Sequence, residues 1–487
     1  MIDCGTPCEM NDTNSNHRGR TLSAAPARPG DGQHVVGPSW NERFGSGTAR
    51  GAFKAVDRYY LVWAFFVPIT SVLVFPSVQG TTPGYLMCFL SLAIAMLYGG
   101  GERTRYLRIL LTAIFVWVLL FTLTQLADLT DGYTPDLDTL SLVNPYDHSF
   151  VMRSSLFTQS LYVVAVVLYG TYLYVYYDDA WDRIIVASGV LFAVYGLYEC
   201  AYYFVTGQSG DFLSNRQFTN TLARPLPKDI VTGSDFQTMG VGGISMQRLK
   251  SLTGEPSMYV LSMFPFWVYA RTVQRSRWPA IMIGVSLVMT ASTTAMVGYL
   301  CYLGIRMMHT RINIIKLVLA ALAIIAIVIV FNEQVVQLAD DVVIKKLTGA
   351  NSSGQERSAG FMAAIDFWLN APVANKLVGI GFGYIRTTDM FSTLLVNNGL
   401  LGIALFSGLL LYPAFKLDWA PKAIALRQCC VATYMMMMVS VPEFSYLAPW
   451  SFVAFAYCRL YHRNRARQVA DRHEVELTAR TSHMREA

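Results

Sequence analysis

The 487-residue chain is 53% hydrophobic and only 14% charged, and its mean hydropathy is +0.37. Soluble domains carry about 25% charged residues, so this composition excludes a soluble protein and predicts an integral membrane protein. The formal net charge of +6 comes from Lys and Arg that are dispersed among short loops. Because they form no basic stripe, we expect no nucleic-acid partner.

The N-terminal part of the chain has the composition of a disordered segment. Residues 1–50 are rich in Gly, Pro, Ser, Thr and Asn and offer no apolar face to bury, so we expect a disordered tail over residues 1–57. We expect no cleaved signal near Met1, since no apolar stretch lies there. A membrane domain over residues 58–461 and a basic tail over residues 462–487 should follow.

Apolar segments of the length of a membrane span follow one another along this domain. A helix that crosses a bilayer needs about 20 mostly apolar residues. The segments that approach this length are 59–76, 84–98, 109–127, 155–177, 184–205, 256–271, 278–292, 294–308, 314–331, 395–415, 423–441 and 447–460. The pattern predicts an all-α polytopic fold with about 12 transmembrane helices.

The distribution of Lys and Arg predicts the orientation. With twelve spans, a set of basic residues in the short loops all falls on one side of the membrane, and cytoplasmic loops are the ones that retain positive charge. These residues are Arg103, Arg105, Arg108, Arg271, Arg275, Arg277, Arg306, Arg311, Lys316, Lys416, Lys422 and Arg427. Both termini are therefore expected in the cytoplasm, and loops 128–154, 206–255 and 332–394 outside.

We expect neither a disulfide framework nor a metal site in the outer loops. All eight cysteines lie in the N-terminal tail or in predicted spans. Of the seven histidines only His148 lies in an outer loop, and no His/Cys/Asp cluster has the spacing of metal ligands. Zinc-dependent chemistry is not expected, and no cofactor is predicted.

The first large outer loop ends in RLKSLTGEPSMY, which contains Arg248, Lys250 and Glu255. An ordinary loop end would explain these charges, with Pro256 in the first turn of a helix. However, basic residues are disfavoured outside the membrane. A planar guanidinium and a helix N-terminus both suit a diphosphate, so Arg248 and Lys250 are candidate anion-binding residues.

The second large outer loop contains an amphipathic stretch. RSAGFMAAIDFWLN places Phe361, Ala364, Ile365 and Trp368 on one helical face, and Pro372 should then stop the helix. Such a helix either lies on the outer leaflet or caps a cavity. GIGFGY follows, as a strand-like or irregular segment that permits close backbone approach.

Two further arginines, Arg357 and Arg386, belong to this loop. Each has an acid nearby in sequence with which it could simply pair, but a lipid diphosphate carries enough charge to require several guanidiniums. Glycosyl transfer with inversion also needs a base for the acceptor hydroxyl. The candidate bases are Glu255 and Asp389.

Two more acids, Glu199 and Glu443, lie near the outer ends of predicted spans. Ionisable residues within a membrane usually face a cavity. A side chain this close to the interface can equally extend its charged end into the headgroup region. Both interpretations stay open for these two residues.

Four local patterns, in this order, resemble the O-antigen ligase and Wzy-type polymerase superfamily of bacterial inner-membrane glycosyltransferases. RLKSLTGEPSMYV resembles the family's arginine and glycine signature before a span, and MTASTTAMVGYL its short hydroxyl-rich turn. SGQERSAGFMAAIDFWLNAPVANKLVGIGFGY resembles its Ser-Gly-x-x-Arg helix followed by Pro and Gly-x-Gly. LLVNNGLLGIAL resembles its Gly-Leu-Leu-Gly entry into a span.

The resemblance implies a GT-C-like fold and metal-independent transfer of a glycan from undecaprenyl diphosphate at the periplasmic face. Arg248 and Arg357 would hold the diphosphate, with Arg386 as a further contact. Ligases of this family commonly place a His shortly before Gly-Leu-Leu-Gly, whereas this chain has TTDMFS there, with Asp389 near that place. The difference favours polymerisation of repeat units over ligation.

Three functions therefore compete. A polymerase would extend undecaprenyl-diphosphate-linked oligosaccharides for O-antigen or exopolysaccharide, with membrane lipid and a chain-length regulator as partners. A ligase would move a finished glycan onto an acceptor. A transporter of a lipid-linked or anionic solute should show charges at mid-span and an internal repeat, and the sequence shows no such repeat.

Overall fold

The computed structural model describes residues 47–130, 137, 140–147, 149–216, 238–241, 244–274, 276–309 and 352–486. Within these residues the chain is mostly helical, in agreement with the predicted all-α class. One antiparallel hairpin pairs β1 (Thr238–Val241) with β2 (Ile244–Gln247). Of the predicted disordered tail over residues 1–57, residues 1–46 lie outside the described residues, whereas residues 47–57 are helical. The predicted span 314–331 also lies outside the described residues.

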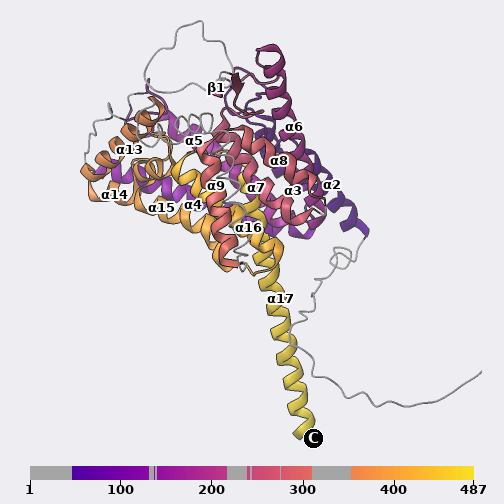
Figure 1. The fold of residues 1–487 in the computed structure, drawn as a ribbon. Coiled ribbons are helices and arrows are strands. Elements are labelled where there is room, and N and C mark those ends of the chain that lie inside the picture. The colour runs from indigo at the N-terminus through magenta and orange to yellow at the C-terminus, as the bar shows by residue number, and fades with distance from the viewer. Residues whose placement is uncertain are drawn as a thin grey trace, which may run out of the picture. The chain divides into compact units, whose positions relative to one another are not determined.

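Figure 1 shows the arrangement of the described helices. They are α2 (Gly47–Trp63), α3 (Pro83–Tyr98), α4 (Arg103–Thr130), α5 (Ser154–Tyr176), α6 (Asp182–Thr206), α7 (Pro256–Val273), α8 (Trp278–Met289), α9 (Thr293–His309), α13 (Ser352–Asn370), α14 (Val373–Val378), α15 (Met390–Lys416), α16 (Pro421–Val439) and α17 (Leu447–Glu486). Short 3₁₀ turns η1 (Gly100–Glu102) and η2 (Asp179–Trp181) precede α4 and α6.

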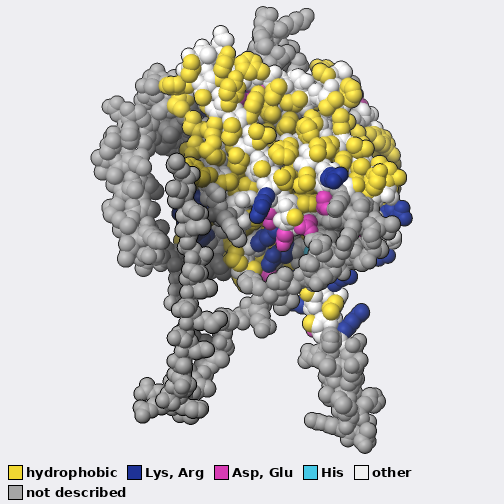
Figure 2. Space-filling model, turned by 90° about the vertical axis from the view of Figure 1, so that its right-hand side faces the viewer, with side chains coloured by type: hydrophobic (Ala, Val, Ile, Leu, Met, Phe, Trp, Pro, Cys, Tyr) yellow, Lys and Arg dark blue, Asp and Glu magenta, His cyan; other side chains and the backbone are white. Residues whose placement is uncertain are grey.

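Four of the described helices are long and apolar enough to cross a membrane: Gly100–Leu129, Ser154–Tyr176, Asp179–Thr206 and Met390–Lys416. Large hydrophobic side chains such as Leu97 and Phe115 are exposed on the surface. Figure 2 shows hydrophobic side chains over much of the described surface in that view. These features are those of a membrane-embedded protein, whereas the count of about twelve spans stays a prediction.

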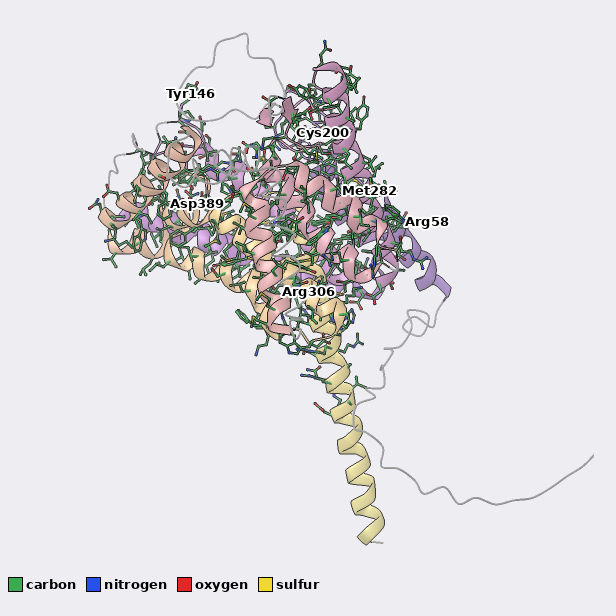
Figure 3. The ribbon with its side chains drawn as sticks, in the orientation of Figure 1. Arg58, Tyr146, Cys200, Met282, Arg306 and Asp389 are labelled. Atoms are coloured by element: carbon green, nitrogen blue, oxygen red, sulfur yellow. The ribbon has the colours of Figure 1, made fainter. Side chains whose placement is uncertain are left out.

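Two residues that the sequence predicts on opposite sides of the membrane lie far apart in the described structure (Figure 3). Figure 3 shows Tyr146, from a predicted outer loop, and Arg306, from a predicted inner one, at opposite ends of the helical bundle. Which of these ends faces the cytoplasm stays a prediction. α17 continues as one helix to Glu486, so the predicted tail over 462–486 extends a helix of the bundle.

The predicted span 59–76 is wrong in its second half. α2 ends at Trp63, and turns occupy much of the segment from residue 64 to residue 82. Pro68 cannot donate a helical hydrogen bond. The amides of Thr70 and Ser71 instead donate to the carbonyl oxygen of Leu252, at 3.0 and 3.1 Å. The apolar run therefore builds an irregular segment against the end of the first outer loop.

The helix α7 forms the centre of the core. It begins at Pro256, as predicted, and its side chains from Met258 to Ala270 are buried. It packs against α6, α8, α9, α16 and α17. The rings of Phe264 and Trp267 are tilted against each other. Each of them makes an edge-on contact with the ring of Tyr299. Because neighbouring helices surround α7, the loop before it is held against the bundle.

The predicted amphipathic helix is confirmed as α13, which ends at Asn370, before Pro372. Ala364 is fully buried. The sequence left open whether this helix lies on the outer leaflet or caps a cavity. In the described structure it packs against α15.

Glycines allow the segment after α14 to lie directly against α15. α15 contains a break at Gly399, where φ is +60°, and a Cβ there would lie 2.5 Å from the Leu377 carbonyl. The amides of Ile380 and Gly381 donate to the carbonyl oxygens of Val396 and Asn397, at 3.0 and 2.9 Å. The segment is irregular, and it carries the chain towards Arg386 and Asp389.

Candidate functional site

Arg248 is fixed by the short turn between α8 and α9. Its Nε donates to the carbonyl oxygen of Thr290 at 3.0 Å, and its Nη2 to that of Ala291 at 3.2 Å. Ala291 has a left-handed backbone, with φ of +44°. Basic side chains often bind such carbonyl oxygens at helix ends. The guanidinium therefore has a structural task as well as a fixed direction.

The charges nearest Arg248 come from both outer loops. Burial lowers the pKa of Arg248, the Glu255 carboxylate opposes this shift, and the Arg357 guanidinium adds to it. An arginine remains protonated in spite of such shifts. The positive charges of Arg248 and Arg357, which are far apart in sequence, therefore act on each other.

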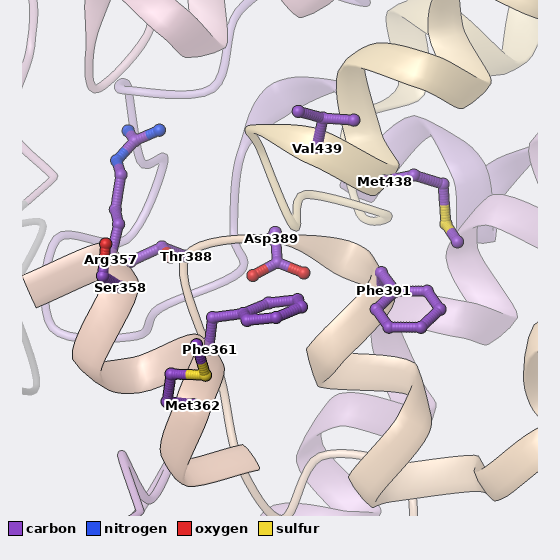
Figure 4. Close-up of a pocket in the computed structure, with 9 residues that line it drawn as sticks. All are labelled: Arg357, Ser358, Phe361, Met362, Thr388, Asp389, Phe391, Met438 and Val439. Atoms are coloured by element: carbon purple, nitrogen blue, oxygen red, sulfur yellow. The ribbon is translucent and has the colours of Figure 1, made fainter. Parts of the chain in front are cut away.

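Arg357 stands at a pocket of about 490 Å³ between α13, α15 and α16 (Figure 4). The lining residues are Arg357, Ser358, Phe361, Met362, Thr388, Asp389, Phe391, Met438 and Val439. Most of this wall is apolar, and Phe361 and Phe391 stack with their ring centroids 6.2 Å apart. The pocket thus combines an apolar wall with one guanidinium and one carboxyl group.

Asp389 has a structural task within this pocket, because it caps the N-terminus of α15. Its Oδ1 accepts from the amide of Ser392 at 2.8 Å and its Oδ2 from the Ser392 hydroxyl at 2.7 Å. Burial raises the pKa of Asp389, while the bonds from Ser392 and the charge of Arg357 oppose the rise. A cap of this kind is the ordinary role of Asp at this position.

Arg386 pairs with Glu443, which lies on the segment between α16 and α17. The Arg386 side chain is 46% exposed, whereas that of Glu443 is 8% exposed. The other carboxylate oxygen of Glu443 accepts from the Ser445 hydroxyl at 3.2 Å. The segment after GIGFGY is thereby joined to the end of α16.

The carboxylate of Glu255 interacts electrostatically with two of the predicted arginines. Glu255 immediately precedes α7, and its Oε2 accepts from the Ser257 hydroxyl at 3.1 Å. Its charge acts on Arg248 and also on Arg386. Among the predicted residues, Glu255 is therefore the acid that connects both arginine positions.

Lys250 occupies a different environment. Its Nζ forms an ion pair with Asp211, and the two side chains are 2% and 6% exposed. It does not line the pocket described above. Glu199 acts on this pair, is fully buried, and has no hydrogen-bond partner among the described residues.

One arginine near the site, Arg216, was not predicted. It donates from Nη1 to the carbonyl oxygen of Thr70 at 3.0 Å and from Nε to Gln79 at 3.2 Å, and its charge acts on Arg386. The signal that selected Arg248, a basic residue in an outer loop, applies equally to Arg216. Glu443 was noticed in the sequence, but its pairing with Arg386 was not foreseen.

No protein-family model, curated protein or solved structure matches this chain. The resemblance to the O-antigen ligase and polymerase superfamily therefore stays a prediction.

Proposed function

We propose that this protein polymerises oligosaccharide repeat units linked to undecaprenyl diphosphate, at the periplasmic face of a bacterial inner membrane. The product would be an O-antigen or an exopolysaccharide. Two observations carry this proposal: Arg357 lines a largely apolar pocket, and the positive charges of Arg248 and Arg357 act on each other. A lipid diphosphate has the matching chemistry, with an anionic head and an apolar chain.

The two parts of this ligand would have separate partners. The planar guanidiniums of Arg248 and Arg357 suit the phosphate oxygens, which they can bind through paired N–H groups. The first isoprenoid units would contact Phe361, Met362 and Val439. Met362 and Val439 are 66% and 55% exposed, so this wall is continuous with a surface that lipid chains could reach.

The transfer step can be written with the residues present. The acceptor hydroxyl oxygen attacks the anomeric carbon of the donor sugar, and the bond from that carbon to the diphosphate oxygen breaks. The electron pair leaves with the diphosphate, whose developing charge Arg248 and Arg357 would stabilise. The hydroxyl proton passes to a carboxylate, which we assign to Glu255, because Ser392 donates to both oxygens of Asp389.

We propose polymerisation over ligation because the segment TTDMFS lacks the His that ligases of the resembled family carry. Arg357→Ala tests the role of the pocket arginine. In cells that lack the native chain, this variant should reduce polymer at least about a hundredfold at equal protein level. Arg357→Lys should restore little, since lysine has no planar fork.

The matched control is Lys376→Ala, which removes a cation on α14 that does not line the pocket. This variant should make polymer at the wild-type level. Wild-type polymer from Arg357→Ala would remove the basis for a diphosphate site at the pocket.

A further inference from the structure

The pair formed by Arg386 and Glu443 has one fixed member and one adaptable member. The segment that carries Glu443 is held at several points. Ser440 shares a hydrogen bond with Thr294 at 2.6 Å, and Tyr85 donates to the Ser445 carbonyl at 2.5 Å. Glu443 itself is nearly buried, so its carboxylate has little freedom.

Arg386 is the adaptable member. Its side chain is 46% exposed, and among the described residues Glu443 is the acid with which the guanidinium forms an ion pair. A guanidinium has five N–H donors, so a single carboxylate leaves capacity for a further oxyanion. Arginine side chains are long enough to shift their charged ends while their stems stay in place.

Other charged residues act on the Arg386–Glu443 pair. Arg216 and Arg386 act on each other as like charges, and Glu255 acts on Arg386 with the opposite sign. Glu443 offsets the repulsion between the two arginines in the absence of a ligand. A phosphate group is also an oxyanion and would take up the same donors.

We infer that Glu443 is an internal competitor for the ligand, which occupies Arg386 until a ligand of higher negative charge takes this arginine over. The ligand in question, a lipid diphosphate, comes from the proposed function, on which this inference rests. A diphosphate carries more charge than the carboxylate that it displaces, whereas a monophosphate competes less well. Glu443 thereby keeps Arg386 paired until such a ligand binds.

The test uses the full-length protein in detergent, with farnesyl diphosphate, farnesyl monophosphate and farnesol as probes. Glu443→Gln removes the competing charge and keeps the side-chain size. It should tighten diphosphate binding about tenfold, the change that about 1.4 kcal/mol produces. It should tighten monophosphate binding by the same factor or less, because no ligand can gain more than the free energy that displacing the Glu443 carboxylate costs. Farnesol binding should not change.

The sign of this effect separates competition from a structural role. Loss of a merely structural contact would weaken binding, and weaker binding by Glu443→Gln would overturn the inference. In an Arg386→Gln background, Glu443→Gln should have no further effect. Equal tightening in that background would also overturn it, because the carboxylate would then act without Arg386.

Two other variants keep the test decisive. Glu443→Asp withdraws the carboxylate by one methylene and should tighten binding in the same direction but less; unchanged binding counts against the inference. Asp418→Asn is the matched control, because it removes the acid of the Arg459–Asp418 pair, 3.2 Å apart and partly exposed, which does not line the pocket. It should bind all probes as the wild type does, and tightening by this control would overturn the inference.

The two levels of the proposal fail differently. If the wild-type protein binds farnesyl diphosphate no better than farnesol, the diphosphate site of the proposed function fails and the role of Glu443 with it. If the wild type prefers the diphosphate but Glu443→Gln binds identically, only the role of Glu443 fails.

Discussion

Arg248 donates a hydrogen bond from Nε to the carbonyl oxygen of Thr290, at 3.0 Å. This bond joins the end of the first outer loop to the turn between α8 and α9. The first turn of α9, which follows directly, contacts the end of α16 through the Thr294–Ser440 hydrogen bond. The short hydroxyl-rich turn therefore connects Arg248 to the segment that carries Glu443.

Removal of Arg248 should affect both stability and function. Arg248→Ala should lower the free energy of unfolding by about 2 kcal/mol, because charged hydrogen bonds to two carbonyl oxygens are lost. It should also lower polymer formation at least about a hundredfold. Thermal unfolding in detergent and polymer yield per unit of protein measure the two effects.

Arg427 provides the matched control for Arg248. Its Nε and Nη2 also donate to carbonyl oxygens at a helix end, those of Ala414 and Leu417, both at 2.7 Å. Arg427→Gln should therefore cost a similar stability without a fall in activity per folded molecule. Equal loss of activity in both variants would show that Arg248 contributes structure alone.

The break in α15 should depend on Gly399. Gly399→Ala adds a Cβ 2.5 Å from the Leu377 carbonyl at a φ of +60°, which should lower the free energy of unfolding by about 2–4 kcal/mol. Gly408 lies in the same helix with nothing within 4 Å of its Cβ position. Gly408→Ala should be up to about 1 kcal/mol more stable, and an equal loss in both variants would contradict the close approach at Gly399.

The sequence predicted features that depend on local order. Pro256 at the start of α7 and Pro372 after α13 gave correct helix boundaries, because proline acts on its own backbone. The irregular segment from residue 64 was missed, since its apolar composition matches a span and its hydrogen bonds go to Leu252, far along the chain. Hydrophobic periodicity carries no information on such distant partners.

The candidate site shows the same limit. A basic residue in an outer loop is visible in the sequence, so Arg248, Arg357 and Arg386 could be selected from it. The pairing of Arg386 with Glu443 could not, because it depends on how the segment after α14 folds back along α15 and meets the end of α16. The role of Asp389 as the N-cap of α15, where it accepts a hydrogen bond from the Ser392 amide, was not predicted.

The contributions of two acids to the stability of the fold should change with pH in opposite directions. Burial raises the pKa of Asp389, so its contribution to stability is present at low pH and is lost as pH rises through the folded-state pKa. Hydrogen bonds from Ser149 and Ser154 lower the pKa of Asp147, so its contribution is present at neutral pH and is lost on acidification.

Substitution by Asn makes this contrast measurable. Between pH 4 and 7, the Tm of Asp389→Asn should rise relative to wild type as pH increases, since Asn carries no charge to bury. Relative to wild type, the Tm of Asp147→Asn should fall as pH rises through the range below about 4, where the unfolded-state carboxyl titrates, and should then stay level. Parallel trends for the two variants would refute the assigned environments.

The predicted orientation can be tested by labelling single cysteines from outside intact cells. In a background without the native cysteines, Cys at Pro145 should react with a membrane-impermeant maleimide. Cys at Thr104 or Gln274 should react only after permeabilisation, since these positions lie beside the basic residues that the positive-inside rule assigns to the cytoplasm. Labelling of Gln274→Cys in intact cells would invert the outer and inner assignments.

The central claim is that the protein lengthens a glycan on its lipid carrier, and the length of carrier-linked glycan in cells that lack the protein tests it most directly. The account predicts that only single repeat units remain, still delivered to their destination. Long chains stranded on the carrier would contradict polymerisation and favour ligation, and an unchanged glycan profile would contradict glycosyl transfer altogether.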